Sequence, residues 1–531
     1  MNNQLLTAAQ MRVLEQACIA SGQATGLELM ERAGQGAVDA ILQEWPELAA
    51  APGRALVLCG PGNNGGDGFV LARVLVGKGW DAEVFLYGDA AKLPPDARMN
   101  YERWMETGPV VPLPEGGLPM PNGATLVVDA LFGTGLGRPL SAIGKTLRDL
   151  CDCVDGGRGL PLSQRLPHFP PVAAIDLPSG LCSDSGRVIG AADGTTANGG
   201  RALSAAADLT LSFHGLKTGH LLADGPRHCG KVRVVDIGLG ESPATDLVRI
   251  ARPGRALLGK RTGHKYEHGH ALILTGGMGR TGAARLSARA ALRVGSGLVT
   301  CAAPGGAMME CATQLTAVML RRCDDAAALT AILCDERVNA LCLGPGMGVS
   351  ERTAELLDVA MATKRKIVLD ADALSVLAAR DDPFAKLHEN CVLTPHGGEF
   401  GRLFPDIAGR LAAPAKTGPA YSKVEATRDA ARRAGCTVLF KGPDTVIADE
   451  RGRALINAAF YDRAVPWLAT AGSGDVLAGL ITGLLARGLA PLGAASSAAW
   501  LHVEAARAFG PGLIAEDLPE ILPRVLAALE R

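Results

Sequence analysis

The chain is poor in aromatic residues, carries no excess charge and lacks long apolar runs, and these shortages exclude several classes of protein. Aromatic side chains make up 4% of the 531 residues, and 53 Lys and Arg residues against 54 Asp and Glu residues give a net charge of -1. Such a balance provides no bulk attraction for nucleic acid or for an anionic membrane surface. A transmembrane helix is not expected either, because no stretch of about 18 apolar residues occurs.

The 13 cysteines form no Cys-x-x-Cys pair, which argues against a disulfide framework and against a cysteine zinc site. The first residues, MNNQLLTAAQMRVLEQ, contain no apolar signal core and carry charges early. We therefore expect a reduced, cytoplasmic protein. Apolar residues make up 48% of the chain, which is enough for large cores.

Glycine is abundant by contrast, and short apolar strands alternate twice with helical segments. In the first series, strands are expected at 55–60, 82–88, 125–130, 172–180, 208–213 and 231–238. The pattern fades after 240 and resumes at 270–277, and the end of the chain, 473–531, is expected to be helical. This alternation predicts α/β domains with parallel sheets and helices on both faces. We assign 1–240 and 263–531 to the two domains, 241–262 to a linker and 154–170 to an exposed loop.

The segment GPGNNGGDGFV, residues 60–70, lies between a predicted strand and a predicted helix. We expect its glycines at 62, 65, 66 and 68 to adopt positive φ and to turn backbone amides toward a ligand. The start of the following helix adds the positive end of a helix dipole, so the segment suits a phosphate or pyrophosphate. It is not a Walker loop, because no Gly-Lys-Ser/Thr follows. A plain glycine turn is the alternative.

Two later strands end in Asp129 and Asp176, and a glycine-rich loop, 133–139, follows the first of them. Ligands of such sheets bind in the crevice outside the carboxyl ends of the strands. Asn64, Asp129 and Ser179 supply hard oxygens without a thiolate or an imidazole, which suits an alkali or alkaline-earth cation. Strand-end caps are the alternative for both aspartates.

In the second domain, GMGRTG at 277–282 is a formal GxGxxG, but no acidic residue ends the next strand, so a dinucleotide site is not supported. More informative are GPGMG (344–348), LDADAL (369–374), TPHGGEF (394–400), FKGPDTV (440–446) and ATAGSGDVLAG (469–479). Residues 472–474 open a helix, so their amides can bind an anion beside Asp475. This arrangement holds a phosphoryl group while a carboxylate takes a proton from a hydroxyl. A chance helix cap is the alternative.

Three histidines, His264, His268 and His270, precede a strand of the second series. Except for Glu267 they lack cysteine or acidic partners at metal-ligand spacing. We therefore favour a solvated linker over a zinc site.

Together these motifs resemble the NAD(P)H-hydrate repair enzymes. Residues 60–70, 129–139 and 176–180 look like the epimerase domain of that family, and 277–282, 344–348, 394–400, 441–445 and 472–475 look like its dehydratase domain. The order and the fusion resemble the bacterial bifunctional form. The resemblance implies a Rossmann-like three-layer domain followed by a ribokinase-like α/β domain. It also implies that NAD(P)HX and ADP are the ligands and that the enzyme is a homo-oligomer that binds neither nucleic acid nor membrane.

The resemblance also implies site residues. The first site would bind the hydrate through Asn63, Asn64, Gly65, Gly66, Asp67, Gly133, Thr134, Gly135, Leu136, Gly137, Arg138, Pro139 and Asp176, with potassium at Asn64, Asp129 and Ser179. The second would bind it through Ala283, Gly346, His396 and Asp475. The nucleotide, ADP with magnesium, would lie on Lys441, Gly442, Pro443, Asp444, Thr445 and Gly474.

The implied activities are epimerisation of R and S NAD(P)HX, with Asp176 as acid/base, and dehydration of the S form. In the second reaction ADP would phosphorylate the hydroxyl, Asp475 would be the base, and AMP and phosphate would be released. One departure from the family pattern is Gly397, where a proline usually follows the histidine. The alternative function is a ribokinase-type small-molecule kinase with a regulatory or nucleotide-binding first domain.

Overall fold

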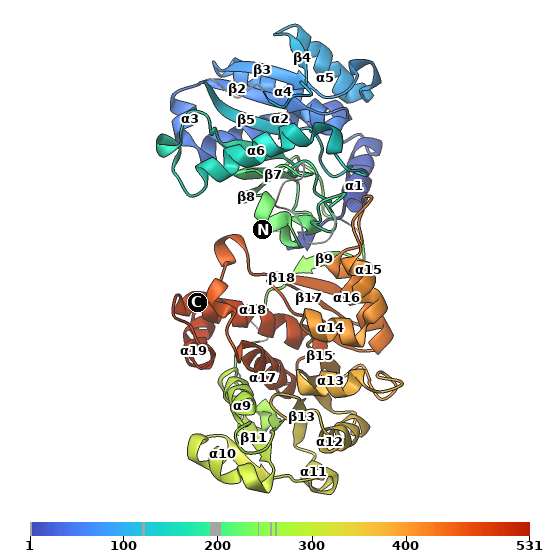
Figure 1. Ribbon diagram of the computed structural model, residues 1–531, viewed down its shortest axis with the longest axis vertical. Coiled ribbons are helices and arrows are strands. Elements are labelled where there is room, and N and C mark those ends of the chain that lie inside the picture. Colours follow the sequence, from blue (N-terminus) through green and yellow to red (C-terminus); the bar gives the residue numbers. More distant parts are fainter. Residues whose placement is uncertain are drawn as a thin grey trace. The chain divides into compact units, whose positions relative to one another are not determined.

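The computed structural model describes residues 3–118, 123–191, 203–242, 244–254, 258–260 and 263–530 (Figure 1). It divides into two compact units. The first comprises Met1–Leu247 and Ala412–Ser422, and the second comprises Val248–Leu411 and Lys423–Arg531. In the described residues, no helix is long and apolar enough to cross a membrane.

The first unit is built on a parallel sheet with the strand order β4-β3-β2-β5-β6-β7-β8. The strands are β2 (Arg54–Cys59), β3 (Asp81–Leu86), β4 (Val110–Pro112), β5 (Ala124–Ala130), β6 (Val172–Ile175), β7 (Leu209–Phe213) and β8 (Lys231–Val235). Each of these strands except β4 begins within four residues of the start of a predicted strand. Strand β4 was not predicted. All seven strands run in the same direction. The segments that follow β2, β5, β6 and β7 therefore begin at the same end of the sheet, its carboxyl edge.

Helices cover both faces of this sheet, which confirms the predicted three-layer α/β arrangement. In β2, Ala55, Val57 and Cys59 face one core and Leu56 and Leu58 face the other, as the two-residue period of a strand requires. The first core also contains α1 (Ala8–Ala20), α2 (Gly26–Glu44), α4 (Asn63–Gly77) and α5 (Pro95–Met105). The second contains α6 (Gly144–Gly157), which takes up the beginning of the predicted 154–170 loop. The short helices α3 (Pro46–Ala50) and α7 (Gly225–His228) complete the unit.

A segment distant in sequence, Ala412–Ser422, belongs to the first unit. Its Ala415 and Ala420 are buried in the core that contains α6. Gly190 N donates to Ala415 O at 2.7 Å, and Gly418 N donates to Gly137 O at 3.2 Å. The domain boundaries expected from sequence treat 263–531 as continuous, so the structure differs from them here.

The second unit contains a sheet in which only β17 of the described strands runs against its neighbours. The strand order is β9-β18-β17-β16-β15-β14-β13-β10-β11-β12. The strands are β9 (Val248–Ile250), β10 (His270–Leu274), β11 (Leu298–Ala303), β12 (Met319–Arg322), β13 (Val338–Leu343), β14 (Lys366–Leu369), β15 (Cys391–Leu393), β16 (Thr437–Phe440), β17 (Asp444–Ala448) and β18 (Ala454–Ala458).

The segment predicted as a linker contributes β9 to this sheet, because Val248–Ile250 pairs with β18. Residues 243, 255–257 and 261–262 of that segment lie outside the described residues. The solvated linker expected around the histidines is also wrong at His270, which is buried at the start of β10 and hydrogen-bonds Thr300 Oγ1 through Nε2 at 2.7 Å.

Helices surround the second sheet as well. They are α9 (Gly282–Arg293), α10 (Met308–Gln314), α11 (Ala326–Leu333), α12 (Glu351–Ala362), α13 (Asp372–Ala378), α14 (Gly397–Leu403), α15 (Pro405–Ala412), α16 (Lys423–Ala434), α17 (Ser473–Ala486), α18 (Pro491–Phe509) and α19 (Asp517–Glu530). The largely helical end is confirmed. Helix α17 is central, because most of its residues are buried and it packs on α9. A side chain at Gly479 would lie 2.2 Å from Ser287 O, so only glycine allows this approach.

Candidate active sites

A cavity of about 500 Å³ opens at the carboxyl edge of the first sheet. Of the predicted ligand-binding residues, those that line it are Asn63, Asn64, Asp67, Gly133, Thr134, Gly135, Leu136 and Asp176. They come from three separate parts of the sequence, so the predicted convergence of these motifs is present in the structure. Residues of α1, among them Glu15, close another side of the cavity.

The glycine motif forms this cavity differently from our expectation. Asn63 is the first residue of α4, and none of the glycines at 62, 65, 66 and 68 has positive φ. Glycine is needed for close packing instead: a side chain at Gly65 would lie 2.0 Å from Gly60 O. The motif therefore brings the start of α4 against the strand ends, where the first backbone amides of a helix have no partner within the helix.

The glycine motif, the 133–139 loop and the strand end at Asp176 meet at Gly133. A side chain there would lie 2.7 Å from Asn64 Oδ1 and 3.4 Å from Asp176 Cβ. The rest of the loop is directed elsewhere, because Gly137 bonds to Gly418, Arg138 is exposed and Pro139 packs near Gly190.

Asp129 and Ser179 form a buried pair beside the cavity. Asp129 accepts hydrogen bonds from Ser179 N at 2.8 Å, Ser179 Oγ at 2.6 Å and Leu131 N at 3.2 Å. Burial raises the pKa of the Asp129 carboxyl, and these hydrogen bonds oppose the rise. Within the described part of the chain Asp129 has no ion pair, and the buried Asn64 Nδ2 has no hydrogen-bond partner.

Asp176 has a backbone conformation that is unusual for its residue type. Its φ is 65°, in the left-handed region that costs most residues other than glycine about 1–3 kcal/mol. Such strain is found where the surroundings fix a functional side chain. The carboxylate pairs with Lys217, whose Nζ lies 2.6 Å from Asp176 Oδ1.

Two other carboxyl groups share the cavity with Asp176. Burial raises the pKa of Glu15, and the charge of Asp176 raises it further. The pKa of Asp67 lies well above its usual value for the same two reasons, with Glu15 adding to the shift. The cavity therefore contains Asp176, which is paired with a cation, and two carboxyl groups, Glu15 and Asp67, that retain their protons to higher pH than is usual for these residue types.

The second predicted site is at the start of α17. Gly472, with φ 85°, precedes the helix, and Asp475 lies in its first turn. Burial and the charge of Asp370 raise the pKa of Asp475 to about 6, against the opposing effect of Lys441. A carboxyl group with this pKa is suited to accept a proton near neutral pH.

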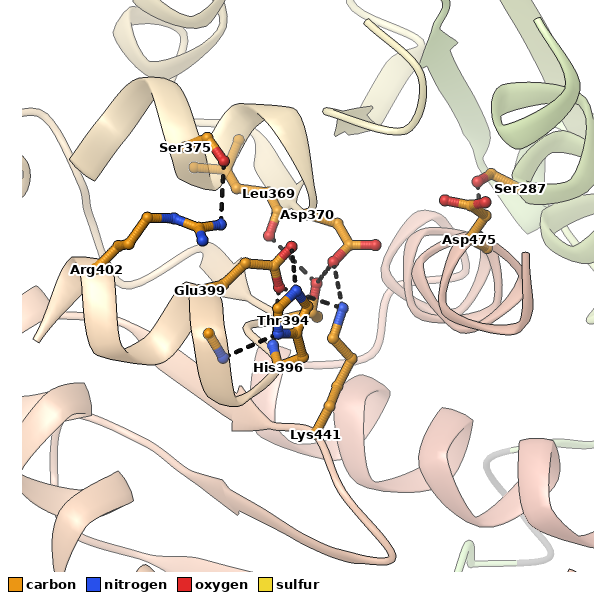
Figure 2. A network of polar contacts seen from close by, with 11 residues as sticks. Ser287, Leu369, Asp370, Ser375, Thr394, His396, Glu399, Arg402, Lys441 and Asp475 are labelled. Atoms are coloured by element: carbon orange, nitrogen blue, oxygen red, sulfur yellow. Dashed lines mark hydrogen bonds and ion pairs between the residues drawn. The ribbon is translucent and has the colours of Figure 1, made fainter. Parts of the chain in front are cut away.

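Lys441 lies at the centre of a polar network beside α17 (Figure 2). Its Nζ is 2.7 Å from Asp370 Oδ1 and 3.6 Å from Glu399 Oε2. Thr394 Oγ1 donates to Asp370 Oδ1 at 2.8 Å. Burial lowers the pKa of Lys441, but the two carboxylates outweigh this effect and the net shift is upward. A side chain at Gly474 would lie 3.7 Å from Lys441 Nζ, so the ammonium group is close to the start of α17.

The predicted hydrate-binding residues of this unit form two groups. His396 caps α14, because its Nδ1 accepts from Gly398 N at 3.0 Å. Its own N donates to Glu399 Oε2 at 2.8 Å, which ties it to the Lys441 network. Gly346 has φ 69°, and a side chain there would lie 3.5 Å from Ala283 Cβ, so these two residues are neighbours.

The predicted nucleotide loop after Lys441 is ordered by its own contacts. Thr445 Oγ1 donates to Gly442 O at 2.7 Å. Lys423 Nζ, at the start of α16, lies 2.6 Å from Asp444 Oδ1 and donates to Lys441 O at 3.2 Å. Pro443 O accepts from Ala459 N at 2.7 Å.

Sequence reasoning missed Lys217, His220 and Glu15 in the first site and Asp370 and Glu399 in the second. Signals for some of them were present. Lys217 stands in the polar run FHGLKTGH after a predicted strand, and the strings LDADAL and TPHGGEF contain Asp370 and Glu399. No group of three or more His, Cys, Asp or Glu residues in the described part of the chain is placed to hold a metal ion.

Comparisons with known proteins identify relatives of both units. The family model "NAD(P)H-hydrate dehydratase" matches 271–524, and "YjeF-related protein N-terminus" matches 26–219. The bifunctional NAD(P)H-hydrate repair enzyme Nnr of Moorella thermoacetica is 34% identical, over 99% of this chain and 97% of the relative. The NAD(P)H-hydrate epimerase of Rhodobacter capsulatus is 46% identical over 42% of this chain and 94% of its own. The solved ADP/ATP-dependent NAD(P)H-hydrate dehydratase of Bacillus subtilis is 29% identical. The match covers 52% of this chain and 96% of that one, with a TM-score of 0.45.

Proposed function

Because the chain belongs to the family of bifunctional NAD(P)H-hydrate repair enzymes, we propose that it converts hydrated NADH and NADPH back to NADH and NADPH in two steps. The first unit epimerises the R and S hydrates, and the second dehydrates the S hydrate at the expense of ADP. The observation that carries this proposal is the similarity to bifunctional relatives over 99% of the chain, which includes both sites. A small-molecule kinase with a regulatory or nucleotide-binding first domain leaves the acidic groups of that cavity, Asp176, Asp67 and Glu15, without a chemical role.

The first reaction needs only acid/base chemistry. The hydrate is a carbinolamine, so the ring nitrogen can expel the hydroxyl group, and water can then add to the other face. We assign to Asp176, paired with Lys217, the acceptance of the proton from the incoming water. The raised pKa of Asp67, caused by burial and by the charge of Asp176, suits it to supply the proton to the departing hydroxyl. The start of α4 and the loop 133–139 would hold the rest of the hydrate.

The second reaction needs a better leaving group than hydroxide. Transfer of the β-phosphoryl group of ADP to the hydroxyl makes one, and AMP is released. Asp475 would take the hydroxyl proton, while Lys441 and the amides of 472–474 would stabilise the phosphoryl group. The ring nitrogen then expels phosphate and NAD(P)H is restored.

Magnesium and the nucleotide fit the second site. The carboxylates of Asp370 and Glu399 supply the hard oxygens that magnesium prefers. Magnesium would neutralise phosphate charge when bound with ADP. The nucleotide itself would lie on Lys441–Thr445 and Gly474, with His396, Ala283 and Gly346 facing the hydrate.

Incubation of the protein with chemically hydrated NADH and ADP tests the proposed function. We expect the absorbance of reduced nicotinamide to return, with AMP and phosphate formed in equal amounts. Omission of ADP should prevent the return. Nucleotide turnover on an unrelated alcohol, without recovery of NADH, would favour the small-molecule kinase.

The residues of the first site also fit potassium. Asp129 is a buried carboxylate without an ion pair among the described residues, and the neighbouring Asn64 amide has an unpartnered buried nitrogen. A cation held by the oxygens of Asn64, Asp129 and Ser179 would compensate the charge of the buried Asp129 carboxylate, whereas the Asn64 nitrogen is a donor and is left for an acceptor such as the hydrate. The cation would supply positive charge that orders the loops around the hydrate.

Epimerisation is therefore expected to be faster in potassium than in tetramethylammonium at equal ionic strength, because the larger ion cannot enter a buried oxygen site. The rates of epimer exchange in the two salts measure the effect. The Asp129→Ala variant should lose the difference, while dehydration of purified S hydrate stays normal. Equal rates for the unsubstituted protein in both salts would show that Asp129 is only a strand-end cap.

A further inference from the structure

A fully buried lysine, Lys217, contacts the proposed acid/base group of the first site. It follows β7, the parallel neighbour of the strand that ends before Asp176. Besides the ion pair with Asp176, its Nζ donates to Ser212 Oγ at 3.2 Å and to Phe213 O at 2.9 Å. These two hydrogen bonds and the ion pair hold the ammonium group in one place, although Asp176 Oδ1 itself accepts no hydrogen bond.

The backbone of Asp176 is held from the same segment. Lys217 N donates to His220 Nδ1 at 3.0 Å, which leaves the ring proton on Nε2. His220 Nε2 then donates to Asp176 O at 2.9 Å. Burial, together with the charge of Lys217, lowers the pKa of His220 to about 4, so the ring is neutral at neutral pH. The segment 217–220 therefore binds both the carboxylate and the carbonyl of one strained residue.

Stability alone does not explain this arrangement. Taking a lysine and a carboxylate out of water costs much of what their attraction returns, and apolar residues of similar volume often stabilise a protein as well or better. Asp176 also lines the cavity, together with two further carboxyl groups, Glu15 and Asp67, whereas Lys217 is not among the lining residues. Of these three acids, Asp176 is the one that Lys217 contacts within ion-pair distance.

We propose that Lys217 is a positioning residue for epimerisation. Its ammonium group fixes the position of the Asp176 carboxylate, and His220 holds the Asp176 backbone in its left-handed conformation. The inference rests on the proposed role of Asp176. Epimerisation then depends on a cation, the Lys217 ammonium group, that need not touch the hydrate.

Chemical rescue tests the inference with the full-length protein. Lys217→Met should lower kcat for epimerisation by about 10- to 100-fold with little change in KM, because the base is displaced while the hydrate-binding loops remain. Lys217→Ala should be similarly impaired, and propylammonium should restore part of its kcat by occupying the vacated space. Propanol, which is neutral and of similar size, should not. Lys231→Met, which removes a half-exposed lysine on β8, is the matched control and should retain the normal rate.

Dehydration of purified S hydrate by the same variants reports that the second unit is folded, the KM for epimerisation reports the same of the first unit, and Asp176→Asn is measured in parallel. Normal epimerisation by Lys217→Met, together with an inactive Asp176→Asn, would overturn the role of Lys217 alone. The role of Lys217 would also be overturned if neither the amine nor the alcohol restored the epimerisation rate of a folded Lys217→Ala protein. Equal restoration by both would overturn it too, because the positive charge would then make no difference. Normal epimerisation by Asp176→Asn would instead remove the proposed function of Asp176.

Discussion

Replacement of Asp475 by asparagine is expected to lower the rate of S-hydrate dehydration by about 100- to 10,000-fold, the usual cost of losing a general base. Asparagine keeps the shape of the side chain but cannot accept the hydroxyl proton. The first site does not use Asp475, so epimerisation should continue at its normal rate. Single-turnover dehydration of purified S hydrate with saturating ADP gives the measurement.

The pH dependence of the same reaction provides a second readout. Burial and the charge of Asp370 raise the pKa of Asp475 to about 6. A base must be deprotonated to act, so the rate should fall as the pH decreases through about 6 and should level off above it. The residual rate of Asp475→Asn should lack this step, because the titrating group has been removed.

A matched control is available in Asp406, which also lies in the first turn of a helix, α15. It is exposed and paired with Arg433, which holds the pKa of Asp406 down to about 2. Asp406→Asn makes the same chemical change at a helix start away from the Lys441 network, and the dehydration rate should be unaffected. A dehydration rate of Asp475→Asn within a few-fold of normal would assign Asp475 to a helix cap.

Much of the fold was predictable because strands of parallel sheets, buried on both faces, appear as short continuous apolar runs. The run at 55–60 and the strand β2 are an example. The glycine motif was located correctly but explained wrongly. Spacing alone does not distinguish a glycine that needs positive φ from one, such as Gly65, that allows a helix to approach a strand.

The parts that could not be predicted depend on tertiary contacts. Ala412–Ser422 joins the core of the first unit although the sequence on both sides of it belongs to the second, and no local pattern reports such packing. The partners of the predicted acids were missed for the same reason. Lys217 and Asp176 follow different strands, and Asp370 and Lys441 are likewise brought together only by the order of strands in the sheet.

The second large effect is expected from Asp176→Asn, which should stop epimerisation and leave dehydration intact. Asparagine is preferable to alanine here, because it keeps a side-chain oxygen beside the buried Lys217 ammonium, whereas alanine removes it and is expected to destabilise the chain by about 3–5 kcal/mol. Asparagine also tolerates the left-handed conformation at φ 65° better than most residues do. The loss can therefore be attributed to proton transfer.

A mixture of R and S hydrates makes the result visible in one reaction. With the unsubstituted protein and ADP, both epimers should be consumed, because the R form is converted as the S form is removed. With Asp176→Asn, consumption should stall once the S form is exhausted, apart from slow spontaneous exchange. Chiral chromatography should then find only the R form. Addition of Asp475→Asn protein should restart consumption, because its intact first site converts the remaining R form for the intact second site of Asp176→Asn. If both epimers disappear at the normal rate without that addition, the base of the first site is another group in the cavity, with Glu15 and Asp67 as the nearest alternatives.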